Sequence, residues 1–211
     1  MLRVGLTGGM ATGKSSVAEM FARRGARVLH ADEVAHQLIA PGQPLFAEVV
    51  KRFGSDIVQA DGSISRALLA EKAFGGGRIQ ELNRVLHPAV IAKQEQWMAE
   101  VAQQDPNGVA IIEAALIFEA RVNRRFDKIV VVSCAPEQRA ARFAARGGMP
   151  LEQAQKEVDR RMAAQMPEAE KIKAADYVVD NSGSLAATEA QVEKIYGELA
   201  KLAAKSVASG Q

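Results

Sequence analysis

The stretch GGMATGKS, residues 8–15, decides the fold of this chain, because it fits the phosphate-binding pattern Gly-x-x-x-x-Gly-Lys-[Ser/Thr]. An apolar run at residues 2–6 precedes it and is typical of a buried strand, and a helical pattern follows at residues 15–24. A strand, a glycine loop and a helix are the context that such a loop needs. The stretch therefore predicts a site for a nucleoside triphosphate, without saying what happens to the triphosphate.

The residue types in this loop explain the chemistry that it supports. Its glycines allow a tight turn in which successive backbone N–H groups converge, and a helix N-terminus adds to their attraction for phosphate oxygens. Lys14 supplies a positive charge for the β- and γ-phosphates, and the Ser15 hydroxyl can be a ligand of Mg²⁺. A glycine-rich turn that precedes a helix by chance is the alternative, and the complete motif with both flanks argues against it.

Composition narrows the remaining classes of protein. The 211 residues suit one domain with insertions or two small domains, and a hydrophobic content of 48% suits a packed core. A net charge of +2 favours neither nucleic acid nor a membrane surface as a partner. Cys134 is the single cysteine and indicates a reducing, cytoplasmic setting. We expect no signal peptide, because the first strand starts at once, and no membrane span.

Further apolar runs at residues 26–29, 109–112, 128–133 and 177–179 predict four more strands. Strands that alternate with helices predict an α/β fold with a five-stranded parallel sheet between helical layers, and ligands collect at the carboxyl ends of such strands. Ser65 is expected to cap one helix, and Pro88 to stand in the first turn of another. Helices are expected at residues 33–39, 45–53, 66–74, 79–86, 88–104, 136–146, 151–165 and 184–204.

Two acidic residues follow predicted strands at the edge where ligands collect. Asp32 could orient an acceptor hydroxyl and take its proton, could help to hold Mg²⁺, or could cap the helix that starts at Glu33. Glu113 stands where triphosphate enzymes often have a carboxylate associated with the metal, or it is a solvated loop acid. Spacing alone leaves these alternatives open.

A cluster of arginines lies beyond the fourth strand. Arg139, Arg142 and Arg146 share a broad face of one predicted helix, and Arg160 and Arg161 lie on the next. Arginines stabilise the charge that develops during phosphoryl transfer, and a helix–Gly–Gly–helix hairpin could close over a nucleotide as a lid. The alternative is a solvated face that pairs with nearby acids. The position after strand four favours the lid.

Other short motifs follow in a defined order along nearly the whole chain. They are Gly5 to Ser15, Ala31-Asp32, Pro41-Gly42, Asp61-Gly62 with Arg66, Leu86-His87-Pro88, Leu116-Ile117-Phe118-Glu119, Glu137, Arg142, Arg146, Gln165, Lys171, Ala175-Asp176 and Asp180-Asn181-Ser182-Gly183. As an ordered set they resemble the dephospho-coenzyme A kinase family, whose members complete coenzyme A biosynthesis. The phosphate loop alone is shared by many families, whereas the ordered set is far more specific.

The resemblance implies an ATP- and Mg²⁺-dependent enzyme that phosphorylates the 3′-hydroxyl of dephospho-coenzyme A to give coenzyme A and ADP. It implies one P-loop kinase domain at residues 1–205, with a helical acceptor-binding insertion at about 60–105 and a helical lid at about 139–168. Residues 206–211 are expected to form a flexible tail. The small-molecule substrate would be the main partner of a cytoplasmic protein that is a monomer or a weak homo-oligomer.

The resemblance also implies roles for individual residues. Catalytic roles fall to Asp32, as a base or as an orienter of the hydroxyl, and to Lys14 and Arg142. ATP would be bound by Gly9, Ala11, Thr12, Gly13, Lys14, Ser15, Ser16, Arg142 and Asn181, the last near the adenine. The acceptor would be bound by Thr7, Asp32, Arg66, His87, Arg146 and Gln165. Ser15 would hold Mg²⁺ together with phosphates and waters.

Three positions depart from the family pattern. The family often has aspartate where His30 stands, proline where Ala115 stands, and glutamine where Arg139 stands, so no family role passes to Arg139. Another kinase of this architecture, for example one that acts on nucleoside monophosphates, would share the loop, the base and the lid. A GTP-dependent switch should carry an Asn-Lys-x-Asp pattern, which this sequence does not contain.

Overall fold

The computed structural model describes residues 1–208. The backbone divides into two compact units, which we describe separately. The sheet unit joins Met1–Leu29 to the chain from Met98 onward, and the helical unit is His30–Trp97. The phosphate loop and the arginine-rich helices therefore belong to the sheet unit.

The sheet unit is built on a five-stranded sheet in the order β2-β3-β1-β4-β5. Parallel pairing joins β1 to both β3 and β4, and β4 to β5. This order places β1 at the centre, so the loop that follows it leaves from the middle of the sheet. The expected five-stranded α/β fold is confirmed. The strands are β1 (Leu2–Gly8), β2 (Arg27–His30), β3 (Val109–Glu113), β4 (Lys128–Ser133) and β5 (Tyr177–Asp180).

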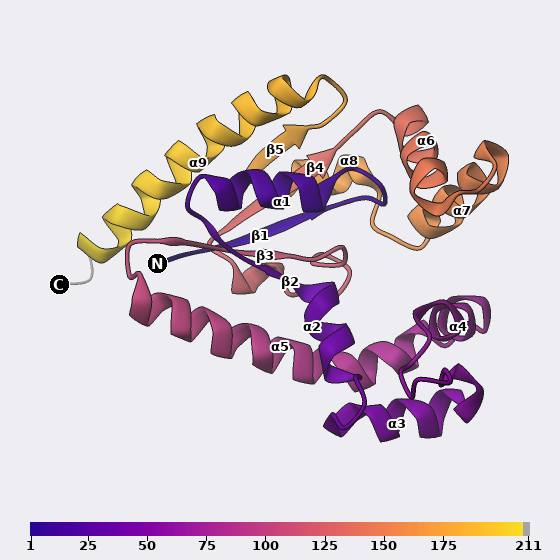
Figure 1. The fold of residues 1–211 in the computed structure, drawn as a ribbon. Helices are drawn as coiled ribbons and strands as arrows, with labels where there is room; N and C mark the ends of the chain where they lie inside the picture. The colour runs from indigo at the N-terminus through magenta and orange to yellow at the C-terminus, as the bar shows by residue number, and fades with distance from the viewer. Residues whose placement is uncertain (209–211) are drawn as a thin grey trace. The chain divides into compact units, whose positions relative to one another are not determined.

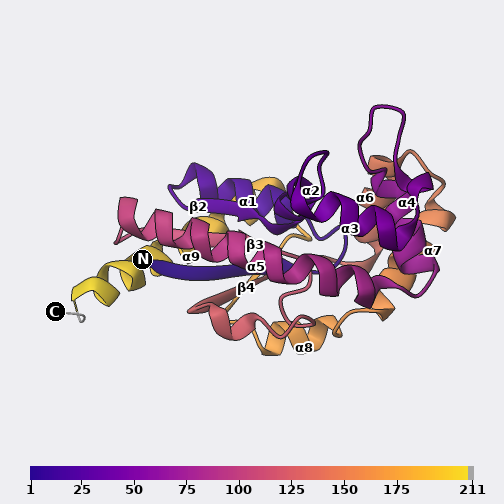
Figure 2. The ribbon, with the colours of Figure 1, turned by 90° about the horizontal axis from the view of Figure 1, so that it is seen from below.

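Alternation along the strands creates a separate core on each face of the sheet. Leu6 of β1 and Val132 of β4 face one core, to which α1 (Lys14–Arg23) and α9 (Leu185–Ala208) contribute. Figure 1 shows these two helices on the same side of the sheet. Ile129 of β4 belongs to a second cluster, and helix α8 (Glu168–Lys173) contacts β4. Figure 2 shows α8 and α1 on opposite sides of β1.

The arginine-rich segment forms two helices, α6 (Pro136–Gly147) and α7 (Leu151–Ala163), which pack on each other. Gly148 ends α6 in the left-handed conformation, with φ of 61°, as a glycine C-cap does. The predicted helix at residues 151–165 stops at Ala163, and Pro167 precedes α8, a helix that the sequence analysis did not predict. Proline restricts the residue before it to extended conformations, so the chain starts a new helix.

The helical unit contains α2 (Ala31–Leu38), α3 (Pro44–Phe53), α4 (Arg66–Ala70) and the first part of α5 (Ile79–Gln104). Short 3₁₀ turns occur at Ser55–Ile57 and, in the sheet unit, at Asn123–Arg125, and a π-helical turn at Glu71–Gly75 extends α4. The Ser65 hydroxyl accepts a hydrogen bond from the N–H of Leu68 at 3.3 Å, which confirms the predicted cap.

Two expectations for this unit are wrong. Pro88 does not begin a separate helix, because α5 continues through it. Proline removes one backbone donor and crowds the carbonyl group of residue i−4, and the buried Leu86 and Val90 on either side keep the helix packed. Asp32 is not a helix cap, because α2 begins at Ala31 with His30 as its N-cap residue.

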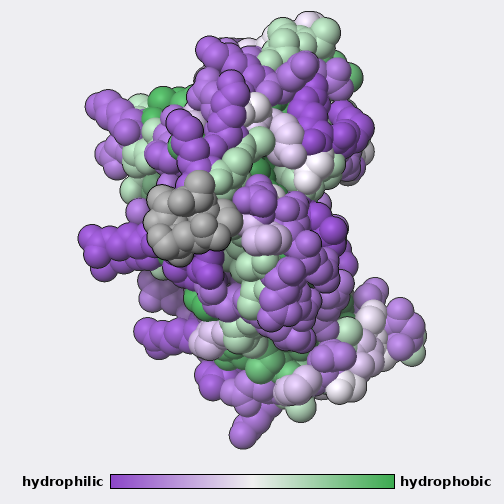
Figure 3. Space-filling model, turned by 90° about the vertical axis from the view of Figure 1, so that its left-hand side faces the viewer, coloured by the Kyte–Doolittle hydropathy of each residue, from purple (hydrophilic) through white to green (hydrophobic). Residues whose placement is uncertain are grey.

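Large exposed apolar side chains are few among the described residues: Leu68, Leu151, Ile172, Val178 and Leu185. The face drawn in Figure 3 is mainly hydrophilic, with small apolar areas between polar side chains. No helix within residues 1–208 combines the length and the hydropathy needed to cross a membrane. Helix α9 extends to Ala208, past the predicted end near residue 204, and residues 209–211 of the expected tail lie outside the described residues.

Replacement of Phe21 by alanine should lower the free energy of unfolding by about 3–5 kcal/mol, because this fully buried ring fills the core between sheet and helices. Denaturant unfolding followed by circular dichroism measures the change. The control is Leu185→Ala, at a side chain that is 65% exposed, which should stay within about 0.5 kcal/mol of the parent. Equal losses in the two variants would contradict this account of the core.

Candidate nucleotide site

The phosphate loop connects β1 to α1, and its glycines stand where the backbone passes close to other groups. A Cβ atom on Gly8 would lie 2.2 Å from the carbonyl oxygen of Val132. Gly13 has a φ of 90°, and a Cβ atom there would lie 2.2 Å from Nδ2 of Asn181. The motif therefore requires glycine at these positions for reasons of space as well as of backbone conformation.

The carbonyl groups of the loop accept hydrogen bonds from donors of the protein. The Gly9 carbonyl accepts from the Thr12 hydroxyl at 3.0 Å and from the Lys14 ammonium group at 2.9 Å. The Thr12 carbonyl accepts from Asn181 Nδ2 at 2.8 Å and from Arg142 Nη1 at 3.4 Å. Because the first turn of α1 has N–H groups without partners inside the helix, anions find donors there.

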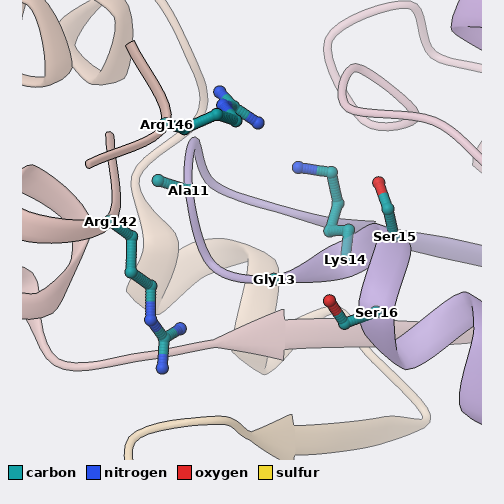
Figure 4. Close-up of a pocket in the computed structure, with 7 residues that line it drawn as sticks. All are labelled: Ala11, Gly13, Lys14, Ser15, Ser16, Arg142 and Arg146. Carbon is teal, nitrogen blue, oxygen red and sulfur yellow. The ribbon is translucent and has the colours of Figure 1, made fainter. Parts of the chain in front are cut away.

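A pocket of about 190 Å³ adjoins the loop. In Figure 4 the side chains of Lys14 and Ser15 project from the start of α1, and Arg142 and Arg146 come from α6. The volume is below the roughly 300 Å³ at which ordinary ligand pockets begin, so it suits a phosphate chain better than a whole nucleotide. Three cationic side chains and a helix N-terminus make it a site for anions. The lining residues are Ala11, Gly13, Lys14, Ser15, Ser16, Arg142 and Arg146.

Asn181 links the loop to the last helix. Its Oδ1 accepts from the hydroxyl of Thr188 at 2.9 Å, its Nδ2 donates to the Thr12 carbonyl, and its own carbonyl accepts from Arg142 Nη2 at 2.8 Å. Thr188 lies on α9 and is fully buried. Thr188 was not among the residues predicted from the sequence, where its only signal was a polar residue within a helix that is otherwise largely apolar on one side.

The structure places two predicted acceptor residues of the sheet unit outside the lining of this pocket. Thr7 is fully buried, and its hydroxyl donates to the carbonyl of Ala115 at 3.2 Å. Gln165 is half-buried, and its Oε1 accepts from the ammonium group of Lys171 at 3.0 Å. Each side chain thus has a bonding partner within the protein. Gly9 and Thr12 shape the loop without lining the pocket.

The other arginines of α6 and α7 are not gathered at the pocket. Arg139 is 5% exposed and pairs with Glu168, so it lies neither in the lining of the pocket nor on a solvated face. Arg160 and Arg161 both pair with Glu157. The hydrogen bond from Arg160 is the largest cause that lowers the pKa of Glu157 to about 2, with further contributions from Arg161. Glu157 therefore stays ionised at neutral pH.

Glu113 ends β3 and is only 7% exposed, so the interpretation as a solvated loop acid is wrong. It pairs in register with Leu6 of β1, two residues before the loop begins at Gly8. A buried carboxylate at this end of the sheet keeps its place as a candidate for metal-associated chemistry. Among residues 1–208, no group of three or more His, Cys, Asp or Glu side chains could hold a metal ion by itself.

Asp32, Arg66 and His87 all belong to the helical unit. Asp32 is exposed in the first turn of α2, and Arg66 is exposed as the first residue of α4. Burial lowers the pKa of His87, and burial followed by the positive charge of Arg66 lowers the pKa of His36. Both imidazoles are therefore neutral at pH 7. His36, for which no role was predicted from the sequence, follows Asp32 by one helical turn on α2.

The central loop of a parallel sheet, the cationic pocket and the helix N-terminus define a P-loop protein of the class that binds nucleoside triphosphates. The model of the family described as dephospho-CoA kinase matches residues 2–187, and the chain belongs to this family. The resemblance noted in the sequence is thereby confirmed.

Individual relatives agree with this assignment. A dephospho-CoA kinase of Syntrophotalea carbinolica is 40% identical over 200 residues, which cover 94% of this chain and 92% of the relative. One of Corynebacterium glutamicum is 38% identical over 94% of this chain and 98% of its own. A crystal structure of a protein from Thermus thermophilus matches with a TM-score of 0.73 and 32% identity, over 94% of this chain and 97% of that chain.

Gly13→Ala should weaken ATP binding by about 10- to 100-fold, because the added methyl group collides with Asn181 and strains a left-handed residue. Isothermal titration calorimetry with ATP and Mg²⁺ measures the affinity. The matched control is Gly62→Ala, where φ is also positive at 81° and no atom lies within 4 Å of the new Cβ. Unchanged affinity in Gly13→Ala would contradict the described loop.

Thr188→Val should weaken ATP binding by about tenfold, because it removes a buried donor and leaves Oδ1 of Asn181 unpaired. Thr188→Ser keeps a hydroxyl group and should restore most of the affinity. The same calorimetric titration compares the three proteins. A loss that is as large for serine as for valine would show that packing, and not the hydrogen bond to Asn181, is what the loop requires.

Proposed function

We propose that this protein transfers the γ-phosphoryl group of ATP to the 3′-hydroxyl of dephospho-coenzyme A, giving coenzyme A and ADP. The observation that carries the proposal is a complete phosphate loop beside a cationic pocket, in a chain that belongs to the dephospho-CoA kinase family. Phosphoryl transfer needs little covalent help from the protein, so positioning and charge stabilisation are the functions that the residues must supply.

The proposed ATP site uses the loop and the start of α1. Backbone N–H groups and Lys14 would bind the phosphates, and the exposed Ser15 hydroxyl, with phosphates and waters, would hold Mg²⁺. This fits the absence of a protein-only metal cluster within residues 1–208, because Mg²⁺ usually keeps several waters and takes few protein ligands. Glu113 is a second candidate, through a water of the metal. The bound ion would neutralise charge on the phosphates.

Arg142 is the proposed stabiliser of charge on the transferred group, with Arg146 in support. Both line the pocket from α6. Arg142 uses two of its nitrogens on the carbonyl groups of Thr12 and Asn181. A guanidinium group has five N–H donors, so it can hold these carbonyls and still bind a phosphate oxygen. Asn181 would lie between this arginine and the adenine end of ATP.

The proposed acceptor site draws on the helical unit. Asp32 carries an exposed carboxylate that would orient the ribose hydroxyl and accept its proton. Arg66 is an exposed cation suited to the diphosphate of dephospho-coenzyme A, and the neutral His87 can donate or accept a hydrogen bond. Thr7 and Gln165 complete the proposed set. We propose that the enzyme is monomeric or weakly homo-oligomeric. We also propose that it is cytoplasmic, which its single, buried cysteine supports.

The experiment that tests this function measures ADP release from ATP and Mg²⁺ with and without dephospho-coenzyme A, together with the mass of the product. The expected result is ADP that depends on the acceptor and a product heavier by one phosphate. Adenosine should be a poor acceptor, because it lacks the remote groups whose binding contributes to the rate. Equal efficiency with adenosine, or preference for a nucleoside monophosphate, would overturn the assignment of the acceptor.

Asp32→Asn should lower kcat by about 10²- to 10⁴-fold, because the carboxylate that accepts the proton is lost. Its affinity for ATP should stay within about threefold of the parent, because Asp32 is proposed to act on the acceptor. Steady-state kinetics and calorimetry provide the two readouts. Glu33→Gln is the matched control, at the next residue of the same helix, and should retain activity. Parental kcat in Asp32→Asn would remove this residue from the mechanism.

A further inference from the structure

Two largely buried ion pairs converge on the short helix α8. Glu168 pairs with Arg139, and Lys171 pairs with Glu119 at 2.7 Å. The side chains of Arg139 and Lys171 are 6% and 1% exposed. Glu168 and Lys171 are three residues apart on α8, yet they bind residues from different parts of the chain. Helix α8 is therefore tied to two elements at once.

The Lys171 pair fixes α8 to the loop that follows β3. The Lys171 ammonium group also donates to Gln165 at 3.0 Å, and Oε1 of Glu119 also accepts from the N–H of Met166 at 3.0 Å. The carboxylate of Glu119 thus holds both helix α8 and the turn between α7 and α8. Glu168 consequently stands on an element that is anchored independently of Arg139.

Arg139 connects this anchored helix to α6. It lies on α6, three residues before Arg142, and its Nη2 donates both to Glu168 and, at 2.9 Å, to the carbonyl of Cys134, which directly follows β4. Its Nη1 lies 4.0 Å from the sulfur of Met162 on α7. A Cβ on Gly9 of the phosphate loop would lie 3.0 Å from that same sulfur. Arg139 thus joins β4, α6, α7 and α8 beside the loop.

The free-energy cost of burying charges indicates that the Arg139–Glu168 pair does more than stabilise the fold. Removing two charges from water costs free energy that an ion pair recovers only when its remaining polar atoms are satisfied. Nε of Arg139 and Oε1 of Glu168 are buried and have no hydrogen-bond partner in the described structure. An apolar pair of similar volume would stabilise the fold about as well. The pair does, however, fix the orientation of α6 relative to α8, because it joins specific atoms on these two helices.

We propose that the Arg139–Glu168 ion pair positions Arg142 for phosphoryl transfer. It fixes the first turns of α6 against β4 and α8, so that Arg142, less than one turn further on, reaches the Thr12 and Asn181 carbonyls at the phosphate loop. Arg139 is a positioning residue, since it acts through Arg142 and does not line the pocket. The proposal rests on the proposed function only in the role that it gives to Arg142.

A double-mutant cycle on kcat tests whether Arg139 acts through Arg142. In the parent enzyme, Arg139→Met removes the guanidinium group without introducing the glutamine that the family often has at this position. It should lower kcat by about 100-fold, since small misplacements of a catalytic group cost this much, while the KM for ATP changes by less than about threefold. In an Arg142→Gln background, the same substitution should lower kcat by no more than about twofold, because coupled residues are not additive. An equal loss in both backgrounds would overturn the proposal.

A second readout tests the anchor without depending on turnover. In Arg139→Met, hydrogen exchange at the amides of residues 140–147 should become about tenfold faster, while exchange in β1 and β4 stays unchanged. Glu152→Gln is the matched control, because it breaks an exposed ion pair with Lys156 on α7, and it should change neither exchange nor kcat.

The two readouts separate failure of this proposal from failure of the proposed function. Parent enzyme that shows no turnover with dephospho-coenzyme A would refute the proposed function, and the exchange measurement would still decide whether Arg139 anchors α6. Exchange at residues 140–147 that is as slow in Arg139→Met as in the parent would overturn the anchor, whatever the turnover. Accelerated exchange across the whole sheet would also overturn it, because Arg139 would then serve only general stability.

Discussion

The candidate site depends on the hydrogen bonds that the carbonyl group of Thr12 accepts. A loop that turns N–H groups toward phosphate needs donors for its carbonyl groups on the protein side. Asn181 supplies one of these donors from the end of β5, and Arg142 supplies another from α6. Segments that are distant in the sequence meet here, so the loop is held from the end of β5, from α9 through Thr188, and from α6 through Arg142.

The parallel sheet makes this meeting possible. Because β1 is central and β4 and β5 follow on one side, the carboxyl ends of these strands deliver the loop, the start of α6 and Asn181 to the same edge. Close approach then restricts the residue type, since a Cβ on Gly8 would lie only 2.2 Å from the Val132 carbonyl oxygen. The basic pocket follows from this topology, in a chain that belongs to the dephospho-CoA kinase family.

The sequence predicted the parallel sheet and the phosphate loop well, because continuous apolar runs and a complete motif are local signals. Ser65 was recognised as a cap for the same reason. The continuation of the helix through Pro88 and the partner of Arg139 could not be predicted from the local sequence. The helix continues through Pro88 because of its buried neighbours, and the partner of Arg139 lies on α8, a helix the sequence analysis did not predict. Asp32, Arg66 and His87 lie in the helical unit, and their roles remain predictions from the resemblance.

The position of the new phosphate tests the functional account most directly. After reaction with ATP and Mg²⁺, the product made from dephospho-coenzyme A can be examined by two-dimensional ¹H–³¹P correlation spectroscopy. The account predicts a monophosphate whose phosphorus couples to the proton on the 3′ carbon of the ribose. A phosphate on the 2′-hydroxyl or on the pantetheine arm would contradict it, as would hydrolysis of ATP with no phosphorylated acceptor.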